Sequence, residues 1–88
     1  MGDYGSESRI VDGYLKKQGI DKSDLKGYEY DSLNYLYLGY ALNQIDLSKI
    51  TSNDPNFEPL VREADYYRNQ LVAEINKIRE RIRKGSNR

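Results

Sequence analysis

The feature that most constrains the fold is a seven-residue repeat of apolar side chains in the last third of the chain. One set recurs every seven residues at Phe57, Ala64, Leu71 and Ile78, and a companion set stands at Val61, Ile75 and Ile82, interrupted by Arg68. This spacing places both sets on one side of an α-helix and is typical of a coiled-coil seam. It predicts a long, coiled-coil-like helix over residues 55–84.

The predicted ends of this long helix follow from turn and cap chemistry. Asn53 or Asp54 can cap its start, with Pro55 at the first helical position, where proline is tolerated. Gly85 suits the left-handed position after the last turn, so residues 85–88 are expected to be a frayed tail.

A second helix is predicted in a tyrosine-rich segment, because five of the nine tyrosines fall within residues 28–40. Asp31 or Ser32 can cap a helix over residues 31–45. Two stripes emerge at helical spacing: Tyr35, Leu38, Leu42 and Ile45 on one side, and Leu33, Leu36, Tyr37, Tyr40 and Ala41 on another. Tyrosine also has strand propensity, but the leucines, and the absence of Val, Ile and Thr between residues 28 and 44, favour a helix. Gly39 indicates a point where another helix passes closely.

The N-terminal segment predicts a third, shorter helix over residues 6–18. Ser6 can act as its cap, and its apolar face is formed by Ile10, Val11, Tyr14 and Leu15. Gly19 suits the left-handed position after the helix, and residues 20–27 read as a connector with a short turn around residues 23–26. The chain is therefore predicted to be one all-α domain over residues 1–88, a three-helix hairpin or bundle.

The predicted helices differ in length, which bears on what they can cover. A helix over residues 57–84 is about 42 Å long, whereas the tyrosine-rich helix is about 22 Å long. Unless the first helix folds over it, the late part of the long helix is left without a cover inside the chain. The sequence therefore predicts an exposed seam of Ile75, Ile78 and Ile82 that binds a partner helix or a second copy.

Composition excludes several classes of function. The chain has no cysteine and no histidine, so it lacks a disulfide framework, a thiolate nucleophile, a thiolate zinc site and the usual general base. It also lacks the glycine-rich phosphate loops and the EF-hand loop, so no cofactor, metal or catalytic residue is predicted, and the protein is not expected to be an enzyme. No apolar run is long enough to span a bilayer. A cytoplasmic protein without membrane contact fits these features best.

The leading prediction is a small protein-interaction module, which means an adaptor, an inhibitor or an assembly subunit. Its partner is predicted to be another protein, a further copy of the same chain, or both. Tyrosine is enriched at the centres of interfaces, although tyrosines in small helical proteins are also common in the core. The predicted interface residues are Tyr35, Tyr37, Tyr40, Tyr66, Tyr67, Arg68, Ile75, Ile78 and Ile82. For Arg68 two interpretations stand: its head reaches water or Asp65, or it sets the register of an oligomer.

The alternative prediction is a small dimeric protein that contacts nucleic acid through its C-terminal segment. Basic and acidic residues number 14 each, but residues 77–88 hold six basic side chains against one acidic one, a net charge of +5, and residues 1–76 carry −5. Arg79, Arg83 and Lys84 could donate to phosphates. The simpler interpretation is that these cations complement the dipole at a helix C-terminus.

Overall fold

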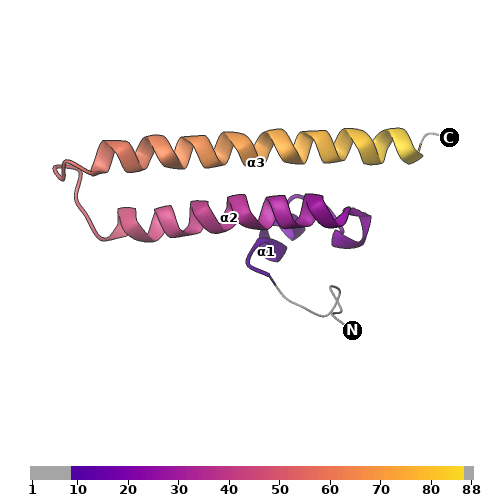
Figure 1. The fold of residues 1–88 in the computed structure, drawn as a ribbon, viewed down its shortest axis with the longest axis horizontal. Coiled ribbons are helices and arrows are strands. Elements are labelled where there is room, and N and C mark those ends of the chain that lie inside the picture. The colour runs from indigo at the N-terminus through magenta and orange to yellow at the C-terminus, as the bar shows by residue number, and fades with distance from the viewer. Residues whose placement is uncertain (1–8, 87–88) are drawn as a thin grey trace.

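Two long antiparallel helices and one short helix make up the fold. The computed structural model of the chain describes residues 9–86. Its elements are α1 (Val11–Lys17), the short 3-10 helix η2 (Lys22–Asp24), α2 (Gly27–Ser48) and α3 (Phe57–Ser86). Figure 1 shows α2 and α3 side by side as a hairpin, with α1 next to the first half of α2. The described residues contain no strand, which confirms the predicted all-α, three-helix architecture. The molecule is elongated, measuring 54 × 31 × 19 Å.

The helix α2 is longer than predicted, because it begins at Gly27 and ends at Ser48. Its first turn is capped by Glu29, whose carboxylate accepts a hydrogen bond from the Lys26 amide at 2.8 Å. The carbonyl of Lys26 in turn accepts from the Tyr30 amide at 3.0 Å. A glutamate that reaches back in this way satisfies an amide of the first turn. The predicted caps, Asp31 and Ser32, were wrong and lie inside the helix.

The start of α1 differs from the prediction, whereas its end agrees. Arg9 and Ile10 precede the helix, so the prediction was wrong for these two residues, and the predicted Ser6 cap and the rest of the predicted start lie outside the described residues. The predicted left-handed Gly19 is confirmed, with φ of 71°. The amide of Ile20 donates to the Leu15 carbonyl at 3.0 Å, which closes the helix end and directs the chain into η2.

Both ends of α3 shift by two residues relative to the prediction. Asp54 forms a turn instead of a direct cap, because its side chain accepts from the Asn56 amide at 2.8 Å and its carbonyl accepts from the Phe57 amide at 2.9 Å. Pro55 therefore precedes the helix. At the other end α3 continues through Gly85 to Ser86, and Gly85 is not in the left-handed conformation.

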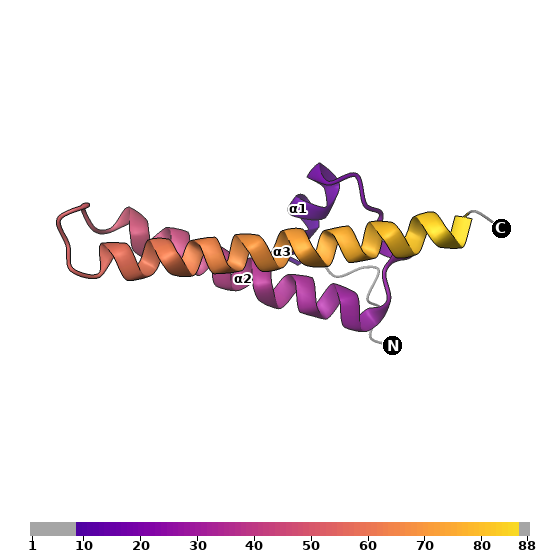
Figure 2. The same cartoon turned by 90° about the horizontal axis from the view of Figure 1, so that it is seen from above.

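The core lies at the end of the hairpin that is farther from the α2–α3 loop. It is formed by Val11, Leu15, Ile20, Tyr30, Leu33, Leu71, Ile75 and Ile78, with Tyr14, Leu25, Leu36, Tyr37, Tyr40 and Ile82 packed against it. Figures 1 and 2 together show the reason for this position of the core, because α3 lies across both α1 and the first half of α2. The prediction that Ile75, Ile78 and Ile82 form an exposed seam was therefore wrong. Ile75 and Ile78 are buried, and Ile82 is half-buried against the core.

The other end of the hairpin holds fewer buried side chains. Asn43 and Ala64 are buried there. The Asn43 amide donates to the Leu60 carbonyl at 2.8 Å and to the Glu63 carboxylate at 3.0 Å, so a polar contact joins α2 to α3 at this level. Figure 2 shows that α1 does not extend to this end.

Gly39 marks a close approach between α2 and α3, as the sequence indicated. A Cβ atom placed on it would lie 2.6 Å from the Tyr67 ring. We expect Gly39→Ala to be less favourable for the stability of the protein when Tyr67 is present than when Tyr67 is replaced by alanine. With Tyr67 present its ring must move to make room for the new Cβ atom, whereas in Tyr67→Ala there is no ring to move. In the Tyr67→Ala background, alanine in place of Gly39 should gain about 1 kcal/mol through helix propensity. A double-mutant cycle in urea should show coupling of about 1 to 3 kcal/mol, and independent effects would contradict the contact.

Candidate protein interface

The outward side of α2 carries a row of exposed apolar side chains. We call this row the outer stripe; it consists of Tyr35, which is 73% exposed, Leu42 at 54%, Ile45 at 50% and Leu38 at 42%. Tyr28, at 69% exposure, extends it toward the start of the helix. Exposed apolar residues that stand singly are ordinary, but a contiguous row of them is typical of an interaction site.

The outer stripe arises from the helical spacing in α2. Its members follow one another at intervals of three and four residues, so they share one side of the helix. The residues that α2 buries, Leu33, Tyr30 and Asn43 among them, face the other two helices. Residues 32–45 include no charged side chain, so α2 is apolar on more of its circumference than α1 and α3 cover. The helix α3 differs, since its exposed side is largely polar.

Two of the predicted interface tyrosines belong to the interior contacts. Tyr37 stacks on Tyr14 of α1 with ring centroids 5.2 Å apart, and it lies 6.2 Å from the Tyr40 ring. Burial raises the pKa of the Tyr14 hydroxyl. Tyr37 and Tyr40 are both half-buried and pack against the core, so they do not line the outer stripe; of the two, it is Tyr37 that joins α1 to α2 by its contact with Tyr14. Of the predicted α2 tyrosines, Tyr35 alone lies in the outer stripe.

The three predicted residues on the first half of α3 lie side by side. Tyr67 is half-buried against Gly39, and Tyr66 meets its ring edge-on at 5.6 Å while remaining 57% exposed. Arg68 is exposed and pairs with Asp65 at 2.7 Å, as one of its two interpretations predicted. Hydrogen bonds with the Tyr40 hydroxyl and with Asp65 raise the pKa of Arg68.

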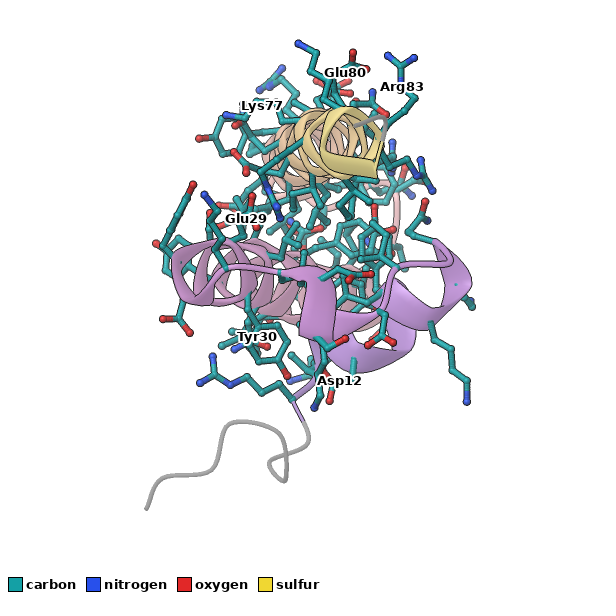
Figure 3. All side chains as sticks on the ribbon, turned by 90° about the vertical axis from the view of Figure 1, so that its right-hand side faces the viewer. Asp12, Glu29, Tyr30, Lys77, Glu80 and Arg83 are labelled. Carbon is teal, nitrogen blue, oxygen red and sulfur yellow. The ribbon has the colours of Figure 1, made fainter. Side chains whose placement is uncertain are left out.

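Two basic residues near the end of α3, Arg79 and Arg83, have partners within the chain. Arg79 donates to the carbonyl of Gln18 at 2.8 Å and to its side-chain oxygen at 3.1 Å, which attaches the end of α1 to α3. Arg83 pairs with Glu80, and in the end-on view both lie on the side of α3 away from the other helices (Figure 3). Lys84 is exposed. Arg79 therefore contributes to the fold. All three residues are exposed, and phosphate contact through them stays a prediction.

An ion pair between a buried glutamate, Glu29, and a half-buried arginine, Arg81, joins α2 to α3. Glu29 lies between the two helices (Figure 3), and Arg81 donates to its two carboxylate oxygens at 2.6 and 2.9 Å. Arg81 also donates to the Asp24 carbonyl at 2.9 Å. Burial by itself raises the pKa of Glu29, but the hydrogen bonds from Arg81 and from the Lys26 amide outweigh it and hold that pKa below its ordinary value.

A second polar cluster joins α1 to α2 through Asp12. The Tyr30 hydroxyl donates to Asp12 at 2.5 Å, and Lys22 pairs with the same carboxylate at 3.3 Å. Burial acts to raise the pKa of Asp12, but these hydrogen bonds, together with one from the Arg9 amide, lower it overall. Tyr30 and Asp12 lie together on the side away from α3 (Figure 3). The cluster is fully explained by its role in holding α1 in place.

The predicted interface residues thus fall into separate places, and of the outer stripe they include only Tyr35. Helical spacing in the sequence already placed Tyr35 on one side of the helix with Leu38, Leu42 and Ile45. The predicted contact residues, however, were mainly the tyrosines and the late isoleucines. Among the residues that the structure describes, no group of acidic side chains could hold a metal ion. Within the same part of the chain, none of the helices has the length and apolar character needed to cross a membrane.

Comparison of the chain with protein-family models, with curated proteins and with solved structures found no match. What the protein does must therefore be inferred from its own surface.

Proposed function

We propose that this protein is a non-catalytic interaction module, an adaptor, inhibitor or assembly subunit, that binds another protein through the outer stripe of α2. The observation that carries the proposal is the stripe itself: four apolar side chains between 42% and 73% exposed, aligned on one side of one helix. Burying such side chains in a complex contributes a favourable free energy of about 25 cal/mol for each Å² of apolar surface removed from water.

The setting of the stripe also supports a protein partner. It lies on a regular helix held by α3 and α1, so its side chains are presented in a fixed order and little backbone order has to be gained on binding. Tyr35 supplies a large, stiff apolar ring with one hydrogen-bonding hydroxyl, the combination that is enriched at the centres of interfaces. The uncharged segment over residues 32–45 lacks the cations that contact with phosphates requires.

Site-specific photocrosslinking in the native cell tests this proposal. A benzoylphenylalanine in place of Leu42 should crosslink to protein, because this residue lies in the middle of the outer stripe. The matched control is the same substitution at Val72 of α3, which is 49% exposed compared with 54% for Leu42. We expect a discrete crosslinked band from Leu42 that is several-fold stronger than any band from Val72.

The controls separate a specific contact from general stickiness. Bands of equal strength from the two positions, or no band from Leu42, would count against the outer stripe as a binding surface. A crosslinked species that disappears with nuclease treatment instead of protease treatment would favour the nucleic-acid alternative.

A further inference from the structure

We infer that the partner of the outer stripe is a second copy of this chain, and that the two copies pair symmetrically with their α2 helices antiparallel. This inference rests on the proposed function and names the occupant of its surface. It comes from the order of charged and apolar residues along the exposed side of α2.

The outer stripe is continued at each end by one charged residue at the same helical spacing. From residue 31 to residue 49 the order along this side is Asp31, Tyr35, Leu38, Leu42, Ile45 and Lys49, and Tyr28 lies three residues before Asp31, outside the paired segment. The intervals alternate between four and three residues, which is the spacing of a seam that pairs two helices. Lys49 is the C-cap of α2 and keeps right-handed helical dihedrals, φ −96° and ψ −4°, so it continues the course of the seam.

This seam is complementary to itself when it is reversed. Rotation about a two-fold axis at the level of residue 40 superposes the four apolar positions on one another and superposes Asp31 on Lys49. In a two-fold dimer each such contact occurs twice. The resulting pairs are Tyr35 with Ile45, Leu38 with Leu42, and Asp31 with Lys49.

Charge decides the direction of pairing. A parallel dimer would bring Asp31 against Asp31 and Lys49 against Lys49, whereas the antiparallel dimer brings each acid to a base. Asp31 already pairs with Arg9 at 2.7 Å, yet its side chain is 56% exposed, so it can accept a second cation. The chain has a net charge of 0, so two copies do not repel one another as whole molecules.

The mass of the purified full chain in solution is the primary test. Small interfaces of this kind reach micromolar dissociation constants, so sedimentation equilibrium at about 100 µM should give the mass of a dimer. Leu42→Glu should shift this mass to that of a monomer while the helical circular dichroism stays the same. Val72→Glu places the same charge on a residue of similar exposure on α3, and it should leave the dimer intact.

Disulfide formation tests the direction of pairing, because the native chain has no cysteine. A mixture of Tyr35→Cys and Ile45→Cys chains, one of them tagged, should form a disulfide between the two variants under mild oxidation. Tyr35→Cys alone should form little, because in the antiparallel dimer the two copies of residue 35 are about 15 Å apart along the helix axis, beyond the reach of a disulfide. Efficient linkage of Tyr35→Cys to itself would overturn the antiparallel arrangement.

The end charges give an independent check. Lys49→Glu should weaken dimerisation by about tenfold, since two attractive contacts become repulsive. Adding Asp31→Lys to Lys49→Glu restores opposite charges at both ends and should recover part of the loss, because Asp31→Lys also removes the ion pair with Arg9. A double variant as weak as the single one would contradict the assigned pairing.

The second-copy inference and the proposed function fail in different ways. A monomer at about 100 µM overturns the dimer. If Leu42 still crosslinks to a different protein in the cell, the proposed function stands with another partner. If Leu42 crosslinks to nothing and the purified chain is monomeric, both are overturned.

Discussion

Replacement of Ile78 by alanine is expected to lower the free energy of unfolding by about 2 to 5 kcal/mol. Ile78 is 1% exposed and packs in the core formed by all three helices, so the substitution removes buried methyl groups and leaves a cavity. A domain of 88 residues buries a limited share of its surface, so a loss of this size would leave much of the protein unfolded. Urea unfolding followed by circular dichroism at 222 nm measures it.

The control for Ile78 is Val72, which lies on the same helix and is 49% exposed. Val72→Ala should change the stability by less than about 0.5 kcal/mol. If Ile78 lay in an exposed isoleucine seam, as the sequence alone predicted, the two substitutions would change the free energy of unfolding by similar amounts. Near-equal effects of Ile78→Ala and Val72→Ala would therefore contradict the burial of Ile78 in the core that the three helices share.

Glu29→Ala is expected to cost about 2 to 4 kcal/mol, the second-largest effect. Glu29 is 7% exposed, and its carboxylate accepts two hydrogen bonds from Arg81 and caps α2 through the Lys26 amide. The substitution removes all of these contacts at once. Glu80→Ala is the matched control, because Glu80 also pairs with an arginine, Arg83, but does so on the exposed side of α3. It should leave stability unchanged within error.

The contribution of Glu29 depends on pH in a defined direction. Its pKa is depressed in the folded state, so its stabilising effect is complete above the pKa of the unfolded chain, about 4.3, and is lost as the pH falls through the lower folded value. The stability difference between the native chain and Glu29→Ala should be constant from pH 6 to 7 and should shrink below about pH 4. A difference that persists unchanged at low pH would show that packing, rather than charge, explains the cost.

The helices of this protein were predictable because their apolar spacing is local information. The heptad positions of α3 are confirmed, since Ala64, Leu71, Ile75 and Ile78 are all buried. Helix ends were less predictable. The start of α2 depends on Glu29, which combines a cap with an ion pair to Arg81 on another helix, and a sequence pattern does not show that combination.

The candidate interface was predicted only in part, because it depends on which surfaces α1 covers. The late isoleucines seemed uncovered when the predicted second helix was about 22 Å long, but α2 extends over 22 residues, or about 33 Å, and α1 fills the remaining side. The outer stripe was visible as a pattern in the sequence. Its exposure was not, because the sequence does not show which of two apolar sides of α2 faces α3.

The attachment of α1 to α3 has a consequence for the order in which the chain folds during synthesis. Arg79 and Gln18 are 61 positions apart, and the core around Leu15 is completed only by residues 71–78 of α3. A chain made from the N-terminus thus leaves the apolar sides of α1 and α2 exposed until most of α3 has left the ribosome. Assembly of the native core is therefore expected to be a late event, with the loop-closure entropy of a long separation to overcome.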